Sequence, residues 1–109
     1  MNTAPALAAI LSTREPERLY SGLSVLVSTA VEGEDVAALA AFGALELLLD
    51  PPRDEADLFT RSLTELIATA RELDTLTIHA CAASVQMLEL TGQPLDGVKS
   101  TPRFLRDTA

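Results

Sequence analysis

Three short apolar runs, separated by longer segments with helical spacing, constrain the fold of this chain more than any other feature. They lie at Ala6–Leu11, Val36–Phe42 and Leu76–Ala80, and they have the length of buried β-strands. The middle run is apolar at every residue, as a central strand covered on both faces would be. Because this run is rich in alanine, periodicity alone leaves a helix open there. The runs predict three buried strands.

A predicted helix joins the first two runs. Glu15, Pro16 and Glu17 place a proline and two carboxylates in the first helical turn, where the unpaired N–H groups and the helix dipole favour them. Apolar residues then recur at helical spacing, at Leu19, Leu23, Leu26, Val27 and Ala30. Gly33 is the expected end of this helix.

A second helix is predicted between the second and third runs. Two prolines in Asp50–Arg53 indicate a loop. Asp54 follows as the expected N-cap, with Glu55 and Asp57 at the positive end of the helix dipole. Capping accounts for these three carboxylates with fewer assumptions than a catalytic pair. The apolar face of this helix comprises Phe59, Leu63, Leu66, Ile67, Ala70 and Leu73.

The last third of the chain predicts smaller elements. A third helix is predicted after the third run, with Val85 and Leu88 on its apolar face and an end near Gly92. Whether Met87 belongs to that apolar face is left open. The tail, residues 93–109, has mixed composition. We expect in it a short strand around Gly97–Lys99 and a helical turn at Pro102–Arg106.

The alternation of strands and helices predicts one α/β domain over residues 1–109, with a mostly parallel sheet flanked by helices. In such sheets, function gathers at the carboxyl ends of the strands. Three segments qualify, namely Ser12–Arg14, the residues from Gly43 onward and Ala80–Ser84.

The charge balance narrows the range of partners. The chain has 16 acidic and 8 basic residues and a net charge of −8, so nucleic acid and anionic membranes are not expected to bind. The longest nearly apolar stretch, Val36–Leu49, is interrupted by Glu46 and is too short to cross a bilayer. No basic residues precede the short apolar run after Met1–Pro5, so we expect no secretory signal. The single cysteine, Cys81, cannot form an internal disulfide, and a reducing cytoplasmic location is the expectation.

Cys81 carries the most informative chemistry, because it falls where the third strand passes into a helix. A sulfur at that position can face the unpaired amides of residues 82–84, which favour the thiolate. Ser84 can donate its hydroxyl to the sulfur. Cysteine is also among the residues most often buried as small apolar filler, so an inert Cys81 stays open.

Two further residues are candidate assistants of Cys81. His79 shares a face of the strand with Cys81, although a packed structural histidine is the simpler interpretation, since the two backbones are nearly 7 Å apart. Arg14 lies at the same edge of the sheet and could steer an anionic sulfur species, or simply be solvated. One cysteine and one histidine are too few for a zinc site. No G-x-G-x-x-G or Walker pattern follows any strand.

The chain resembles the DsrE/DsrF-like sulfur-relay proteins, which are small cytosolic flavodoxin-like domains. The resemblance covers roughly the whole chain and rests on Leu11–Arg18, Phe42–Leu45, Ile78–Met87 and Leu95–Val98. The segment around Cys81 is the most specific of these. The family usually continues through another helix into a final strand, whereas this chain stops after Phe104–Ala109. The sheet is therefore expected to be short of its last strand.

The resemblance implies a function for Cys81. In family members that carry sulfur, the corresponding cysteine accepts a persulfide, no organic cofactor is used, and the proteins form homo-oligomers. By this resemblance the protein is a sulfur carrier or sulfurtransferase that exchanges sulfane sulfur with donor and acceptor proteins through Cys81. Ser84, from its position in the first helical turn, is the second catalytic candidate.

Two hypotheses that assign the protein to other functional classes stay open. In one, the chain is a non-catalytic oligomerisation or interaction module, and Cys81 is buried filler. In the other, it is a regulator that binds a small anion or a nucleotide at the strand ends without covalent chemistry.

Overall fold

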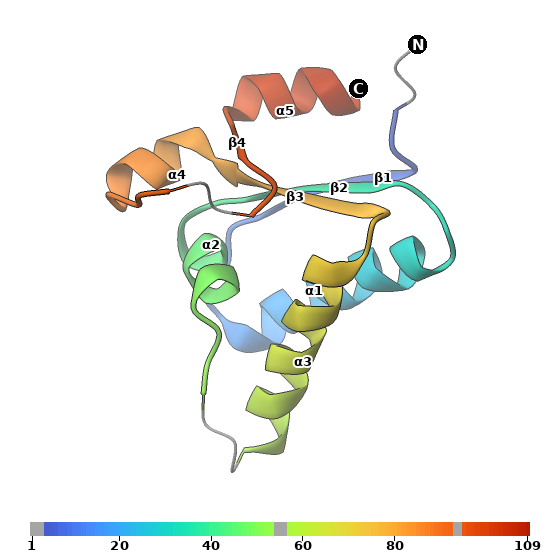
Figure 1. Cartoon of the computed structure of the whole chain (residues 1–109), viewed down its shortest axis with the longest axis vertical. Coiled ribbons are helices and arrows are strands. Elements are labelled where there is room, and N and C mark those ends of the chain that lie inside the picture. Colours follow the sequence, from blue (N-terminus) through green and yellow to red (C-terminus); the bar gives the residue numbers. More distant parts are fainter. Residues whose placement is uncertain (1–3, 54–56, 93–94) are drawn as a thin grey trace.

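The computed structural model describes residues 4–53, 57–92 and 95–109, and it contains one parallel four-stranded sheet (Figure 1). The strands are β1 (Leu7–Leu11), β2 (Val36–Ala40), β3 (Leu76–Cys81) and β4 (Val98–Lys99). Every neighbouring pair of strands is parallel. The predicted α/β class, a parallel sheet flanked by helices, is therefore confirmed, and the alternation of strands and helices is consistent with a flavodoxin-like fold in everything but the order of the strands.

Five helices alternate with or follow the strands in the described part of the chain. They are α1 (Pro16–Val31), α2 (Phe42–Leu49), α3 (Leu58–Glu72), α4 (Ala82–Met87) and α5 (Thr101–Thr108). Helix α1 has Pro16 in its first turn and buries the five apolar residues that its spacing predicts. The chain leaves it through Gly33, whose φ of 93° suits a residue without a side chain.

Helix α3 begins later than predicted. Its N-cap is Asp57, whose carboxylate accepts hydrogen bonds from the Phe59 N–H at 3.3 Å and the Thr60 hydroxyl at 2.6 Å. The predicted cap Asp54 and its neighbour Glu55 lie outside the described residues. Leu63, Ile67 and Ala70 are fully buried, as the spacing predicts. The capping function expected of the acidic segment thus belongs to Asp57.

The prediction of a strand up to Phe42 was wrong at its end. Strand β2 stops at Ala40, and helix α2 starts at Phe42, which has a φ of 47°. The apolar sequence continues because α2 buries Ala44, Leu45 and Leu48 against the same core as the strands. An all-apolar run therefore concealed the junction between a buried strand and a buried helix.

The two faces of the sheet are covered unequally. Helices α1, α2 and α3 lie on one face, shown below the sheet in Figure 1, and pack over the main hydrophobic core. Helix α5 lies on the other face, where Phe104 packs with Leu39, Ala41 and Cys81. The strand order is sequential, β1-β2-β3-β4, rather than the 2-1-3-4-5 order of flavodoxin. Each connection moves to the next strand in the same direction across the sheet. Right-handed crossovers in one direction place their helices on the same face, as is seen for α1 and α3.

The end of the chain completes the far edge of the sheet. The Asp96 carboxylate accepts a hydrogen bond from the Ile78 N–H at 2.7 Å, and the Gly97 carbonyl accepts one from the Ala80 N–H at 2.8 Å. The predicted short strand and helical turn are confirmed as β4 and α5.

Helix α4 ends earlier than predicted, at Met87 instead of near Gly92. Glu89 takes a left-handed φ of 54°, which stops the helix. Val85 and Leu88 pack against the core, whereas Met87 is 71% exposed. Within the described residues, no helix is long and apolar enough to span a bilayer.

Candidate functional site

Cys81 lies at the junction that the sequence predicts. It is the last residue of β3 and the N-cap of α4, at the carboxyl edge of the sheet. Its side chain points to the α5 face, beside Leu39, Ala41 and Phe104. Only 4% of the residue is exposed. The thiol is therefore covered by α5 and is not open to bulk solvent.

Polar groups nevertheless reach the Cys81 sulfur. The Thr101 hydroxyl, in the first turn of α5, is 3.8 Å from Sγ. The hydroxyl and N–H of Ser84 and the N–H of Ala83 also lie close enough to lower the pKa of Cys81, although the Cys81 side chain makes no N-cap hydrogen bond to α4. The Ser84 oxygen accepts the Phe42 N–H at 2.9 Å, so its proton is free to point at the sulfur. Ser84 and Ala83 thus lie near the sulfur as predicted, but the expected hydrogen bond from the amides after β3 to Cys81 is not formed.

The balance of these effects favours the thiolate. Burial raises the pKa of Cys81, but the polar groups of Ser84, Thr101 and Ala83 together outweigh it, and the net pKa lies below the ordinary value. These donors stabilise a negative sulfur because their dipoles point at it in a partly dry environment. The Cys81 sulfur is therefore buried and at the same time surrounded by groups that lower its pKa.

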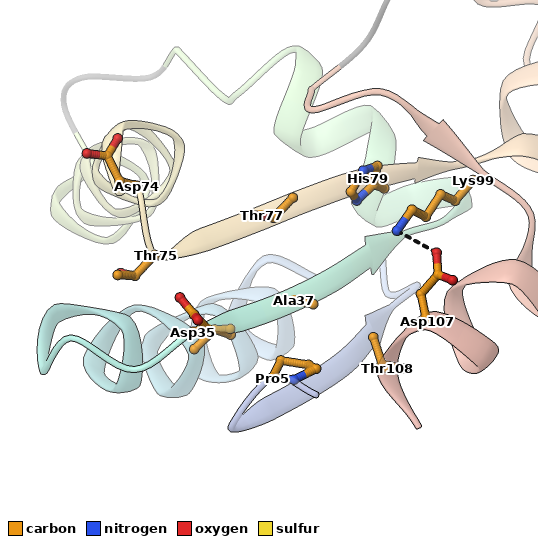
Figure 2. A pocket seen from close by; sticks show the side chains of 11 residues that line it. Pro5, Asp35, Ala37, Asp74, Thr75, Thr77, His79, Lys99, Asp107 and Thr108 are labelled. Atoms are coloured by element: carbon orange, nitrogen blue, oxygen red, sulfur yellow. Dashed lines mark ion pairs between the residues drawn. The ribbon is translucent and has the colours of Figure 1, made fainter. Parts of the chain in front are cut away.

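His79 lies on the same sheet face but is not hydrogen-bonded to Cys81 among the described contacts. It lines a cavity of about 220 Å³ together with Thr77, Lys99 and Asp107 (Figure 2). Burial lowers the pKa of His79, and the Lys99 charge lowers it further, which outweighs the opposing effect of Asp96 and Asp107. His79 is thus neutral near neutral pH, beside the thiol and not in contact with it.

Arg14 is placed elsewhere on the carboxyl edge. Its backbone lies under Gly43, where an added Cβ would come within 2.4 Å of the Arg14 Cβ. The Arg14 side chain lines a separate cavity of about 310 Å³ with Glu46 and Asp50. The structure therefore brings Ser84 to Cys81 and leaves Arg14 in a different cavity.

Sequence reasoning did not identify Thr101 and Lys99 as neighbours of Cys81. Lys99 is aligned with Cys81 in the β3–β4 register, and its ammonium forms a 2.9 Å ion pair with Asp107 of α5. The sequence did contain a signal for these neighbours, because a short parallel strand predicted at Gly97–Lys99 places the residues that follow it at the carboxyl edge of the sheet, beside Cys81. Ser100 caps α5 there by accepting the Arg103 N–H at 3.2 Å.

The described residues contain no group of three or more His, Cys, Asp or Glu side chains that could hold a metal ion. The chain matches no protein-family model and no curated protein.

Replacing Ser84 with alanine tests these contacts. In Ser84→Ala, the sulfur loses a hydroxyl donor, so the pKa of Cys81 is expected to rise and the thiolate fraction at neutral pH to fall. The Phe42 N–H also loses its acceptor, which is expected to cost about 1 kcal/mol of folding stability. The measurement is the rate of Cys81 alkylation against pH.

Two variants accompany this measurement. Thr101→Val is expected to shift the profile to higher pH in the same direction. Ser62→Ala removes a hydroxyl that bonds only within α3, and its profile is expected to match that of the wild type. A Ser84→Ala profile that superimposes on the Ser62→Ala profile contradicts an effect of the Ser84 hydroxyl on the pKa of Cys81.

Proposed function

We propose that this protein accepts sulfane sulfur on Cys81 as a persulfide and passes it to a partner. The observation that carries the proposal is the place of Cys81 at the N-cap of α4, with the Thr101 hydroxyl 3.8 Å from its sulfur and Ser84 nearby. These polar groups lower the pKa of Cys81 despite its burial. A persulfide is more acidic than a thiol, so donors that favour one negative sulfur also favour the terminal sulfur of a persulfide. The resemblance of Ile78–Met87 to the DsrE/DsrF-like sulfur-relay proteins supports the same chemistry.

The transfer needs no oxidant and no cofactor. The Cys81 thiolate attacks the outer sulfur of a donor persulfide, R–S–SH. The new S–S bond forms as the donor's S–S bond breaks, which yields Cys81–S–SH and the thiolate R–S⁻. In the second step an acceptor thiolate attacks the outer sulfur, takes it and restores the Cys81 thiolate. Sulfane sulfur moves in both steps, with no net oxidation.

The proposal requires partners, because Cys81 is the single cysteine of the chain. Donor and acceptor proteins supply the other thiols, in the reducing cytoplasm where such thiols persist. The 4% exposure of Cys81 adds a condition. Helix α5 has to shift before a protein thiol reaches the sulfur, since Thr101 and Phe104 lie against it.

Intact-mass spectrometry tests the proposal. After incubation with polysulfide or a small-molecule persulfide, the wild type is expected to gain the mass of one sulfur atom, and a thiol reductant is expected to remove it. Cys81→Ser keeps the size and polarity of the site and is expected to gain nothing. A wild type that gains no sulfur from any donor, while its Cys81 is alkylated after unfolding, contradicts the function.

A second candidate is an interaction module in which Cys81 is inert. The packing of Cys81 against Leu39, Ala41 and Phe104 favours this alternative. Alkylation against pH separates the two, since an inert thiol is expected to react with an ordinary pKa and only after unfolding. A small-ligand regulator has weaker support, because Lys99 in the 220 Å³ cavity is already paired with Asp107. That reading predicts thermal stabilisation by a ligand in Cys81→Ser as well.

A further inference from the structure

The two edges of the sheet are finished in different ways. At the far edge, β4 is two residues long and the Asp96 carboxylate occupies the Ile78 N–H. At the other edge, β1 pairs only with β2 among the described strands. Its sequence, LAAIL, contains no proline, glycine or charge, which are the usual means by which proteins protect an exposed edge. Strand β1 is therefore open to pairing with another strand.

The open side of β1 has a defined set of hydrogen-bonding groups. The Leu11 carbonyl accepts the N–H of Ala41, which follows β2. Because alternate residues of a strand point to opposite sides, the N–H and C=O groups of Ala8 and Ile10 point away from β2. Ile10 is also 47% exposed on the sheet face. An incoming strand would satisfy these groups and cover this side chain.

The sequence of β1 is nearly symmetric about Ala9. An antiparallel pairing of two copies centred on Ala9 places Leu7 opposite Leu11 and Ala8 opposite Ile10 of the second copy. In that register the outward groups of Ala8 face those of Ile10 from the other chain, as an antiparallel hydrogen-bonded pair requires. Two-fold symmetry therefore fits both the backbone groups and the side chains.

Helix α1 presents a neutral surface beside the same edge. No charged side chain lies between Leu19 and Val31, in a chain that is 22% charged. Gly22 lies over β1, since a Cβ there would be 3.3 Å from the Leu11 side chain. Val25, one turn further along this flank, is 58% exposed. A helix flank without charge is unusual on the surface of a protein with a net charge of −8.

The uncharged flank of α1 has a basic residue before it and an acidic residue after it. The two-fold axis of the β1–β1 pairing would bring the basic residue of one copy opposite the acidic residue of the other. Ala9 lies about 7 Å from Leu11, toward the amino end of β1. Helix α1 runs back in that direction and rises about 1.5 Å per residue, so the α1 residues level with Ala9 come about four positions after Gly22. The two-fold axis therefore passes near Val25. Arg18 lies about two helical turns before Val25, and Glu32, the C-cap of α1, lies about two turns after it. Arg18 pairs with Glu15 of its own chain at 3.3 Å, and under the two-fold axis it also faces Glu32 of the second copy.

We propose that two copies of this chain associate through an antiparallel β1–β1 pairing, with the α1 flanks packed around Val25 and flanked by Arg18–Glu32 ion pairs. The interface uses none of the residues around Cys81 and stands independently of the proposed function. It joins two four-stranded sheets into one continuous sheet with a two-fold axis, the commonest symmetry of soluble oligomers. It also removes the open edge.

The test is the oligomeric state of the full chain, measured by sedimentation velocity and light scattering over a range of concentrations. The wild type is expected to be a dimer. Val25→Glu places two like charges at the axis and is expected to weaken the dimer about a hundredfold. Val31→Glu is the matched control, because it makes the same change at another exposed valine, which is 63% exposed. Val31 lies about three turns after Tyr20 and so on the same flank of α1, and Tyr20 contacts Phe59 of α3. The Val31→Glu variant is expected to remain a dimer.

A charge exchange tests the geometry of the interface. Arg18→Glu is expected to weaken the dimer about tenfold through the two symmetric pairs, and adding Glu32→Arg is expected to restore it. Hydrogen exchange at the Ala8 and Ile10 amides is expected to slow on dimerisation. A wild type that stays monomeric at its highest soluble concentration overturns the proposal. So does a dimer that Val25→Glu and Val31→Glu affect equally.

Discussion

Cys81 in a Phe104→Ala variant is expected to react with a thiol reagent about a hundredfold faster than in the wild type. Phe104 is 2% exposed and is the largest side chain by which α5 is held against the sheet. Removing a buried phenylalanine costs about 3–5 kcal/mol, and each 1.4 kcal/mol changes a population about tenfold. The population in which α5 has left the sheet, and the thiol is accessible, rises accordingly. The measurement is the alkylation rate under native conditions.

The neighbouring residue supplies the control for Phe104→Ala. Leu105 lies on the same helix and is 55% exposed, so Leu105→Ala is expected to leave the alkylation rate near that of the wild type. Circular dichroism checks that both variants keep the fold. Equal rates for the two variants would show that α5 does not control access to Cys81.

Gly43→Ala is expected to destabilise the fold by about 3 kcal/mol. An added Cβ would lie 2.4 Å from the Arg14 Cβ and 2.8 Å from the Arg14 Cα. Neither atom is at the end of a flexible side chain, so the segment after β1 and the start of α2 would have to separate. The measurement is chemical denaturation of the wild type and the variant.

Gly33→Ala separates this steric cost from a conformational one. No atom lies within 4 Å of a Cβ at Gly33, but its φ is 93°. Its expected cost is about 1 kcal/mol, from the left-handed backbone alone. A Gly43→Ala variant no less stable than Gly33→Ala contradicts the close contact between Gly43 and Arg14.

The fold could largely be predicted because local signals agreed with the tertiary structure. The spacing of Leu19, Leu23 and Leu26 and the helix-starting segment at Pro16 marked α1 without reference to any other part of the chain. Likewise, the apolar runs marked β1, β2 and β3. The strand order was not predictable in this way, since it depends on which edges pair and not on any one segment.

The candidate site was predictable only in part. The position of Cys81 between β3 and α4 followed from sequence, and so did its neighbour Ser84. The cover over the thiol did not, because Thr101 and Phe104 are twenty residues or more away in the sequence and reach Cys81 only through the fold. The junction at Phe42 was also hidden, since a buried strand and a buried helix are apolar alike.

The sequential order of the strands has a consequence for how the protein is made. Each strand pairs with the one synthesised before it, so the sheet can assemble in the order in which the ribosome releases the chain. The residues that shelter the thiol, Thr101 and Phe104, follow all four described strands in the sequence. During synthesis the Cys81 sulfur is therefore exposed at the edge of the sheet until α5 has left the ribosome and packed over it.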